Sequence, residues 1–84
     1  MELRVLKYFL VVAQEENMTR ASQLLYISQP TLSRQLMQLE EELGEKLFIR
    51  HSRHVQLTEA GMLLKKHAQD LSLIHISEPT RLQL

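Results

Sequence analysis

The feature that most constrains the fold is a tight break at residues 26–27, between two amphipathic helical segments. Ser28 is suited to cap the helix that follows, because its hydroxyl can accept a hydrogen bond from a free amide of the first turn. Pro30 fits that turn, where the amides have no intrahelical acceptor. The helix is expected to run to Leu43 and to end at Gly44, which readily takes the left-handed cap conformation.

The two sides of this helix differ in character. One side is marked by a leucine at every third or fourth position, namely Leu32, Leu36, Leu39 and Leu43. The other side is polar and lacks acidic residues until position 40; it carries Pro30, Arg34, Met37 and Gln38, with Thr31 and Ser33 on its flanks. At 3.6 residues per turn, we expect the leucines to enter the core and the polar side to stay exposed.

Two further helices are predicted before the break. Residues 3–16 carry two adjacent apolar stripes at helical spacing, and Asn17 is a plausible stop. The stripes are Leu3, Leu6, Leu10 and Ala13, and beside them Val5, Phe9 and Val12. Such a helix is either sunk in its own core or turns one side to a partner. Thr19 is expected to cap a short second helix that ends near Leu25.

The segment after Gly44 predicts a small hairpin and a fourth helix. Two short β-like runs, Leu47 to Arg50 and Val55 to Leu57, flank a basic tip at residues 51–54. Thr58 is expected to cap the fourth helix. Its apolar positions recur at spacings of four, three and four, as in a short coiled-coil seam, at Ala60, Leu64, His67 and Leu71.

Charge placement is more informative than net charge. Ten basic and ten acidic residues balance to +0, whereas nucleic-acid binders usually carry a basic excess. Two windows, 17–38 and 46–58, nevertheless contain only basic charges, at Arg20, Arg34, Lys46, Arg50 and Arg53. If both windows face the same way, a neutral chain presents a basic surface. Charge alone leaves open a scatter of solvated side chains.

Enzymatic and metal-dependent functions have little support in the sequence. The chain has 0 Cys, which excludes disulfides and thiolate nucleophiles and fits a reducing compartment. It contains no glycine-rich phosphate loop, and His51 and His54 in a predicted turn favour solvated side chains over a metal pair. We therefore expect no catalytic residue, no cofactor and no metal. No apolar run approaches the roughly 18 residues that cross a membrane.

The predicted order of elements indicates a mainly α fold of the winged helix-turn-helix type, with a three-helix core, a β-hairpin wing and the start of a C-terminal linker helix. From Met1 to about Asp70 the chain resembles the N-terminal DNA-binding domain of LysR-type transcriptional regulators. The resemblance is carried by Phe9, Thr19-Arg20-Ala21, Leu24, Ser28-Gln29-Pro30, Leu32-Ser33, Gln35, Leu39-Glu40, Leu43-Gly44, Leu47-Phe48, Arg50, Arg53, Leu57-Thr58 and Ala60-Gly61.

The resemblance implies a set of DNA contacts. Those of the recognition helix map onto Gln29, Pro30, Thr31, Ser33 and Arg34. Glutamine can bind adenine through two hydrogen bonds and arginine can bind guanine in the same way. Arg53 matches the wing residue that reaches the minor groove, where narrow A·T-rich segments attract arginine. Phosphate contacts are expected from Thr19, Arg20, Arg50 and His51.

The resemblance also implies a homodimer that binds double-stranded promoter DNA in the cytoplasm, without chemistry on the DNA. In this family the first and fourth helices form the dimer contact, for which Val5, Tyr8, Val12, Leu63 and Leu64 are candidates. The alternative is a protein-docking module, which would need an apolar exposed side on residues 30–43; there only Met37 is apolar.

The end of the chain departs from the family. We divide the chain into a DNA-binding domain at 1–58, a shortened linker and dimerisation helix at 59–70, and a tail at 71–84. The tail has no clear helical or strand period and is similar to translated sequencing-adapter sequence, so we expect it to be non-native. This division predicts a chain without the family's effector-binding domain, and therefore without small-molecule sensing, and with weakened dimerisation.

Overall fold

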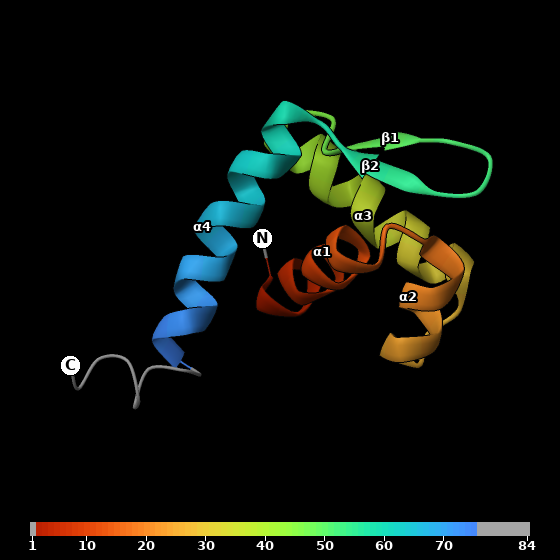
Figure 1. Ribbon diagram of the computed structural model, residues 1–84, viewed down its shortest axis with the longest axis horizontal. Coiled ribbons are helices and arrows are strands. Elements are labelled where there is room, and N and C mark those ends of the chain that lie inside the picture. Colours follow the sequence, from red (N-terminus) through yellow and green to blue (C-terminus); the bar gives the residue numbers. More distant parts are fainter. Residues whose placement is uncertain (1, 76–84) are drawn as a thin grey trace.

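The computed structural model describes residues 2–75 and contains four helices and one hairpin in that range. The elements are α1 (Leu3–Glu15), α2 (Met18–Leu25), α3 (Gln29–Leu43), β1 (Phe48–Arg50), β2 (Val55–Leu57) and α4 (Glu59–His75). The two strands pair antiparallel, with Phe48 opposite Leu57 and Arg50 opposite Val55 (Figure 1). The mainly α, winged helix-turn-helix fold predicted from the sequence is confirmed.

Helix α1 lies at the centre of the molecule and packs against α2, α3, α4 and β2. The largest fully buried side chains are Phe9, Val12, Leu32, Leu36 and Leu47. The Phe9 ring meets the ring of Phe48, with centroids 5.3 Å apart and planes tilted by 48°. Aromatic pairs favour such a tilted contact, which here joins the hairpin to the helical core. Most residues of the two apolar stripes on α1 are buried in the core of their own chain, which is the first of the two alternatives for this helix.

The break that opens the third helix forms as expected. Tyr26 takes the left-handed conformation, with φ at 59°, and ends α2. Ser28 caps α3 by accepting a hydrogen bond from the amide of Thr31 at 3.2 Å, and Pro30 occupies the first turn. Gly44 closes α3 with φ at 72°.

The turn between α1 and α2 differs from the prediction on both sides. Helix α1 ends at Glu15, and Glu16 takes the left-handed conformation that was expected of Asn17. Asn17 instead begins α2, because its Oδ1 accepts a hydrogen bond from the amide of Arg20 at 2.9 Å. The prediction of Thr19 as the cap was therefore wrong, since Thr19 already lies inside the helix.

The last turn of α3 also differs. Leu43 is 40% exposed, because it is the final helical residue and lies past the edge of the core. Glu40, which was expected on the exposed acidic end, is only 7% exposed. Its Oε2 accepts hydrogen bonds from the backbone amides of Leu47 at 2.7 Å and Phe48 at 3.2 Å. Burial of this carboxylate is compensated by those two donors.

Helix α4 begins as predicted and continues further than predicted. Thr58 caps it by accepting from the Gly61 amide at 3.0 Å, and the helix runs to His75 rather than to Asp70. Its core-facing residues are spaced by four, at Ala60, Leu64 and Ala68. His67 is exposed and does not belong to that row, and the side chain of Leu71 lies outside the described residues, so the seam of spacings four, three and four stays a prediction. Residues 76–84 of the expected tail lie outside the described residues.

Candidate nucleic-acid interface

The starts of α2 and α3 and the tip of the hairpin surround one groove of about 460 Å³. Five of the predicted DNA-contact residues line this groove, namely Thr19, Gln29, Arg50, His51 and Arg53. Asn17, Met18, Ser52, His54 and Val55 complete the lining. Among the described residues around the groove none is acidic, so its charged side chains are basic. Such a groove attracts an anionic polymer.

The exposed side chains at the start of α3 are linked by hydrogen bonds. The Thr19 hydroxyl donates to Oε1 of Gln29 at 3.1 Å, which joins α2 to α3. The Ser28 hydroxyl donates to Oγ1 of Thr31 at 2.8 Å, and Nη2 of Arg34 donates to the same oxygen at 3.4 Å. Side chains held in this way lose less rotational freedom when they bind a ligand.

The remaining recognition-helix residues lie on α3 outside the groove lining. Pro30 and Arg34 are exposed, and Thr31 and Ser33 are half-buried. The predicted polar side of α3 is therefore available to a partner.

The tip of the hairpin is a short basic turn. The His51 amide donates to the carbonyl of His54 at 2.8 Å, and the two imidazole rings stack with centroids 4.4 Å apart and planes 13° apart. Nε2 of His51 also lies 2.9 Å from Oε1 of Gln56. Ser52 and Arg53 lie at the apex of this turn and are exposed. The turn thus presents Arg53 at the outermost point of the hairpin.

Arg20, one of the predicted phosphate contacts, is paired with a carboxylate outside the groove. Nε of Arg20 donates to Oε1 of Glu15 at 3.0 Å, and the side chains are 67% and 22% exposed. Arg20 does not line the groove with the other five residues. The Arg20 side of this pair is open to solvent, which weakens the pair, so the guanidinium remains accessible to a phosphate.

The five candidates for a dimer contact differ widely in exposure. Val12 is fully buried and Val5 is 8% exposed, because both pack in the core of their own chain, so the prediction for Val12 is wrong and Val5 offers little surface. Tyr8 and Leu64 are half-buried, while Leu63 is 59% exposed.

Sequence reasoning missed Met62, which is 58% exposed beside Leu63. Position 62 is not part of the predicted seam on α4. The core-facing row at Ala60, Leu64 and Ala68 leaves positions 62 and 63 on the outside, so a spacing of four would have identified it.

Sequence reasoning also missed Glu40, and here a signal existed. Glu40 follows Leu36 by four residues, which places it on the flank of the leucine stripe rather than on the exposed side of α3.

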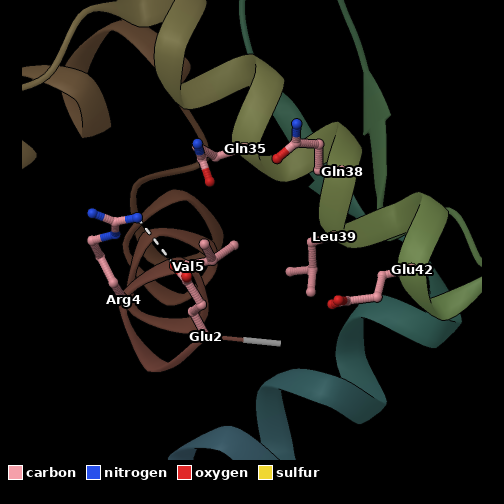
Figure 2. Close-up of a pocket in the computed structure, with 7 residues that line it drawn as sticks. All are labelled: Glu2, Arg4, Val5, Gln35, Gln38, Leu39 and Glu42. Carbon is pink, nitrogen blue, oxygen red and sulfur yellow. Dashed lines mark hydrogen bonds and ion pairs between the residues drawn. The ribbon is translucent and has the colours of Figure 1, made fainter.

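A second polar groove, between the start of α1 and the middle of α3, has a different character. Figure 2 shows its charged side chains, Glu2 and Arg4 from the start of the chain and Glu42 from α3. Nη2 of Arg4 lies 3.0 Å from Oε1 of Glu2, so the cation there is paired with a carboxylate. Two acids and one base make this groove unfavourable for phosphate.

Residues 2–75 show neither a membrane-spanning helix nor a metal-binding cluster. No helix in that range has the length and apolar character needed to cross a bilayer. No group of three or more His, Asp or Glu side chains there is placed to hold a metal ion.

Comparison with solved structures supports the arrangement. The DNA-binding domain of CbnR in complex with DNA matches with a TM-score of 0.84 and 37% identity, over 99% of this chain and 95% of that one. The DNA-binding domain of BenM in complex with catB site 1 DNA matches with a TM-score of 0.83 and 42% identity, over 99% and 91%.

Comparison with curated proteins gives the same family. A probable cat1 operon transcriptional activator of Acinetobacter lwoffii is 56% identical over 68 residues, which are 81% of this chain and 22% of that protein. The regulator BudR of Klebsiella aerogenes is 59% identical over 61 residues, or 73% and 43%. This chain therefore spans less than half the length of these relatives. The profile described as "Bacterial regulatory helix-turn-helix protein, lysR family" matches residues 3–62, and the chain belongs to that family.

Proposed function

We propose that this chain binds double-stranded promoter DNA sequence-specifically, as a homodimer, in the cytoplasm of a bacterial cell. The start of α3 enters the major groove, and the hairpin reaches the adjacent minor groove. The DNA is bound and released without any change to its covalent bonds. As a regulator domain of the lysR family, the chain acts by occupying a promoter site.

The proposed contacts divide into base reading and phosphate binding. Gln29 and Arg34 read bases through paired hydrogen bonds, and Pro30, Thr31 and Ser33 complete the reading surface. Arg53 enters the minor groove. The phosphates are bound by Thr19, Arg20, Arg50 and His51.

The observation that carries this proposal is the basic groove between the start of α3 and the hairpin tip. It gathers Gln29, Arg50 and Arg53 from two elements that the sequence separates by about twenty residues. Relatives solved on DNA share the whole fold at TM-scores of 0.83 to 0.84. A protein-docking surface would be apolar, and this groove is not.

The proposed dimer contact lies mainly on α4, on the other side of α1 from the hairpin tip (Figure 1). Leu63 and Met62 are exposed on α4, with Leu64 half-buried next to them, and Tyr8 is half-buried on α1. A second copy covering these side chains would remove apolar surface from water, at about 25 cal/mol per Å² buried. A dimer also presents two recognition helices to half-sites about one helical turn apart.

The test is binding to DNA across salt concentrations, followed by selection. Fluorescence anisotropy on a generic duplex should show affinity that falls steeply with salt, with a slope near 0.9 per phosphate neutralised. Selection from a pool of random duplexes should then return a site with two related half-sites. An absence of binding at low salt by a chain shown to be folded and dimeric would refute the proposal.

A further inference from the structure

The hairpin that carries Arg53 is too small to hold its own position. Each strand has three residues, and an isolated two-stranded hairpin is at best marginally stable in water. Its orientation therefore depends on contacts with the helices. Those contacts decide where the tip lies relative to the start of α3.

Hydrogen bonds hold the hairpin at both ends, with the Glu40 carboxylate at its base and the carbonyl of Glu16 at the end next to the tip. On the β1 side, Oε2 of Glu40 accepts from the amides of Leu47 at 2.7 Å and Phe48 at 3.2 Å. On the β2 side, the amide of Val55 donates to the carbonyl oxygen of Glu16 at 3.0 Å. The first anchor comes from α3 itself and the second from the turn after α1.

The anchor on α3 is unusual because it is a buried charge. Glu40 is 7% exposed, and a buried carboxylate is costly unless donors surround it. Hydrogen bonds to an ionised acceptor are roughly twice as strong as neutral ones. Both bonds also run from the recognition helix to the hairpin, so they set the angle between the two DNA-contacting elements.

We propose that Glu40 is a positioning residue for DNA binding, which holds β1 against α3 and thereby fixes Arg53 relative to Arg34. The proposal deepens the proposed function and rests on it. If the hairpin is held before binding, Arg53 reaches its groove without a further loss of conformational entropy. If Glu40 is lost, the same arginine must be ordered during binding, and its contribution shrinks.

The experiment compares variants in a thermodynamic cycle. Glu40→Met keeps most of the side-chain length and removes the acceptor, while Glu40→Gln keeps an oxygen that can accept both amides. Each is combined with Arg53→Ala, and dissociation constants are measured by anisotropy on the duplex returned by selection. Thermal unfolding establishes that each variant is folded at the assay temperature.

The expected result is strong coupling between Glu40 and Arg53. Arg53→Ala should weaken binding about tenfold in the wild-type chain, as for loss of one well-placed groove contact. In the Glu40→Met background the same change should cost about twofold or less, whereas Arg34→Ala should keep its full effect. Glu40→Gln should restore the tenfold effect of Arg53→Ala. Glu41→Met, which removes the same charge at an exposed neighbouring position, should also leave it intact.

Multiplicative losses from Glu40→Met and Arg53→Ala would overturn the proposal, because they would show that the two residues act independently. If Glu40→Met does not fold, Glu40→Asp takes its place, since a carboxylate shorter by one methylene cannot keep both amides at their present distances. If Arg53→Ala still weakened DNA binding about tenfold in the Glu40→Asp background, that result would also overturn the proposal.

A measurement without DNA separates this proposal from the proposed function. Hydrogen exchange at the amides of Leu47 and Phe48 should speed up at least tenfold in Glu40→Met, or in Glu40→Asp where that variant replaces it, and stay slow in Glu40→Gln. Unchanged exchange would overturn the proposed role of Glu40 even if the wild-type chain binds DNA. A wild-type chain that binds no duplex would instead refute the proposed function.

Discussion

At the residue scale, one glycine decides whether α4 can approach the hairpin. A Cβ added at Gly61 would overlap the carbonyl oxygen of Leu47 and lie 2.8 Å from Cδ2 of Leu57. The carbonyl belongs to the backbone and cannot turn away. Only the absence of a side chain at this position lets the first turn of α4 pack so closely.

We therefore expect Gly61→Ala to lower the free energy of unfolding by about 1–3 kcal/mol, although alanine is the better helix former. Urea denaturation measures the change. Gly44→Asn is the matched control, because nothing lies within 4 Å of a Cβ there and asparagine tolerates the left-handed conformation. A fully stable Gly61→Ala would contradict the described packing of α4.

A second residue-scale prediction concerns base reading by Arg34. This side chain is exposed on α3 and its Nη2 lies 3.4 Å from Oγ1 of Thr31. Arg34→Ala should cost about 1–3 kcal/mol of binding free energy on the selected duplex and relax the preference at one base position. Competition between the selected and a random duplex measures it. Equal losses on both duplexes would mean that Arg34 binds phosphate instead.

At the element scale, the sequence predicted each helix and strand but not every boundary. Apolar spacing and the break before Ser28 suffice for α3, because cap, proline and glycine all agree. They do not suffice between α1 and α2, where Asn17 and Thr19 are both good caps. The choice depends on Glu16, which takes a φ of 56° although glutamate has no special preference for that conformation.

The two possible caps of α2 make opposite predictions about stability. Asn17→Ala should lower the free energy of unfolding by about 1 kcal/mol, because the Arg20 amide loses its acceptor. Thr19→Val should cost less than half of that, since the Thr19 hydroxyl bonds only the exposed Gln29 side chain among the described contacts. Chemical denaturation of both variants decides between them. The reverse order would restore Thr19 as the cap.

The candidate site, like the helix boundaries, was predictable only in part. The family resemblance predicts DNA contacts for residues such as Gln29 and Arg53, and both line the basic groove. That resemblance assigns no role to Glu40 or Met62, and helical spacing indicates only their place on the helix. Their roles arise from contacts between elements: one carboxylate reaches across to β1, and one side chain is left uncovered by the packing of α4.

At the scale of the whole molecule, two different surfaces lie on opposite sides of α1. The hairpin tip and α2 lie on one side, and α4 lies on the other (Figure 1). The first surface is basic and lines the groove of Arg50 and Arg53; the second exposes Met62 and Leu63. A chain of net charge +0 can therefore attract DNA at one side, because local potential and not total charge steers binding.

This separation predicts that the proposed self-association can be removed without damage to the fold. Leu63→Lys should weaken the dimer at least about tenfold, since a buried cation without a partner is costly in an apolar contact. The thermal stability of the monomer should change little, because Leu63 is 59% exposed. Sedimentation velocity over a range of concentrations measures the effect.

The control for this variant is Leu24→Lys, which places the same charge on α2, where the leucine is 50% exposed. It should leave sedimentation unchanged. If both variants dissociated the chain equally, the dimer contact would not lie on α4. If only Leu63→Lys does so, its affinity for a site with two half-sites should fall, while its affinity for one half-site stays the same. That pattern would show that dimerisation contributes by joining two recognition helices rather than by shaping either one.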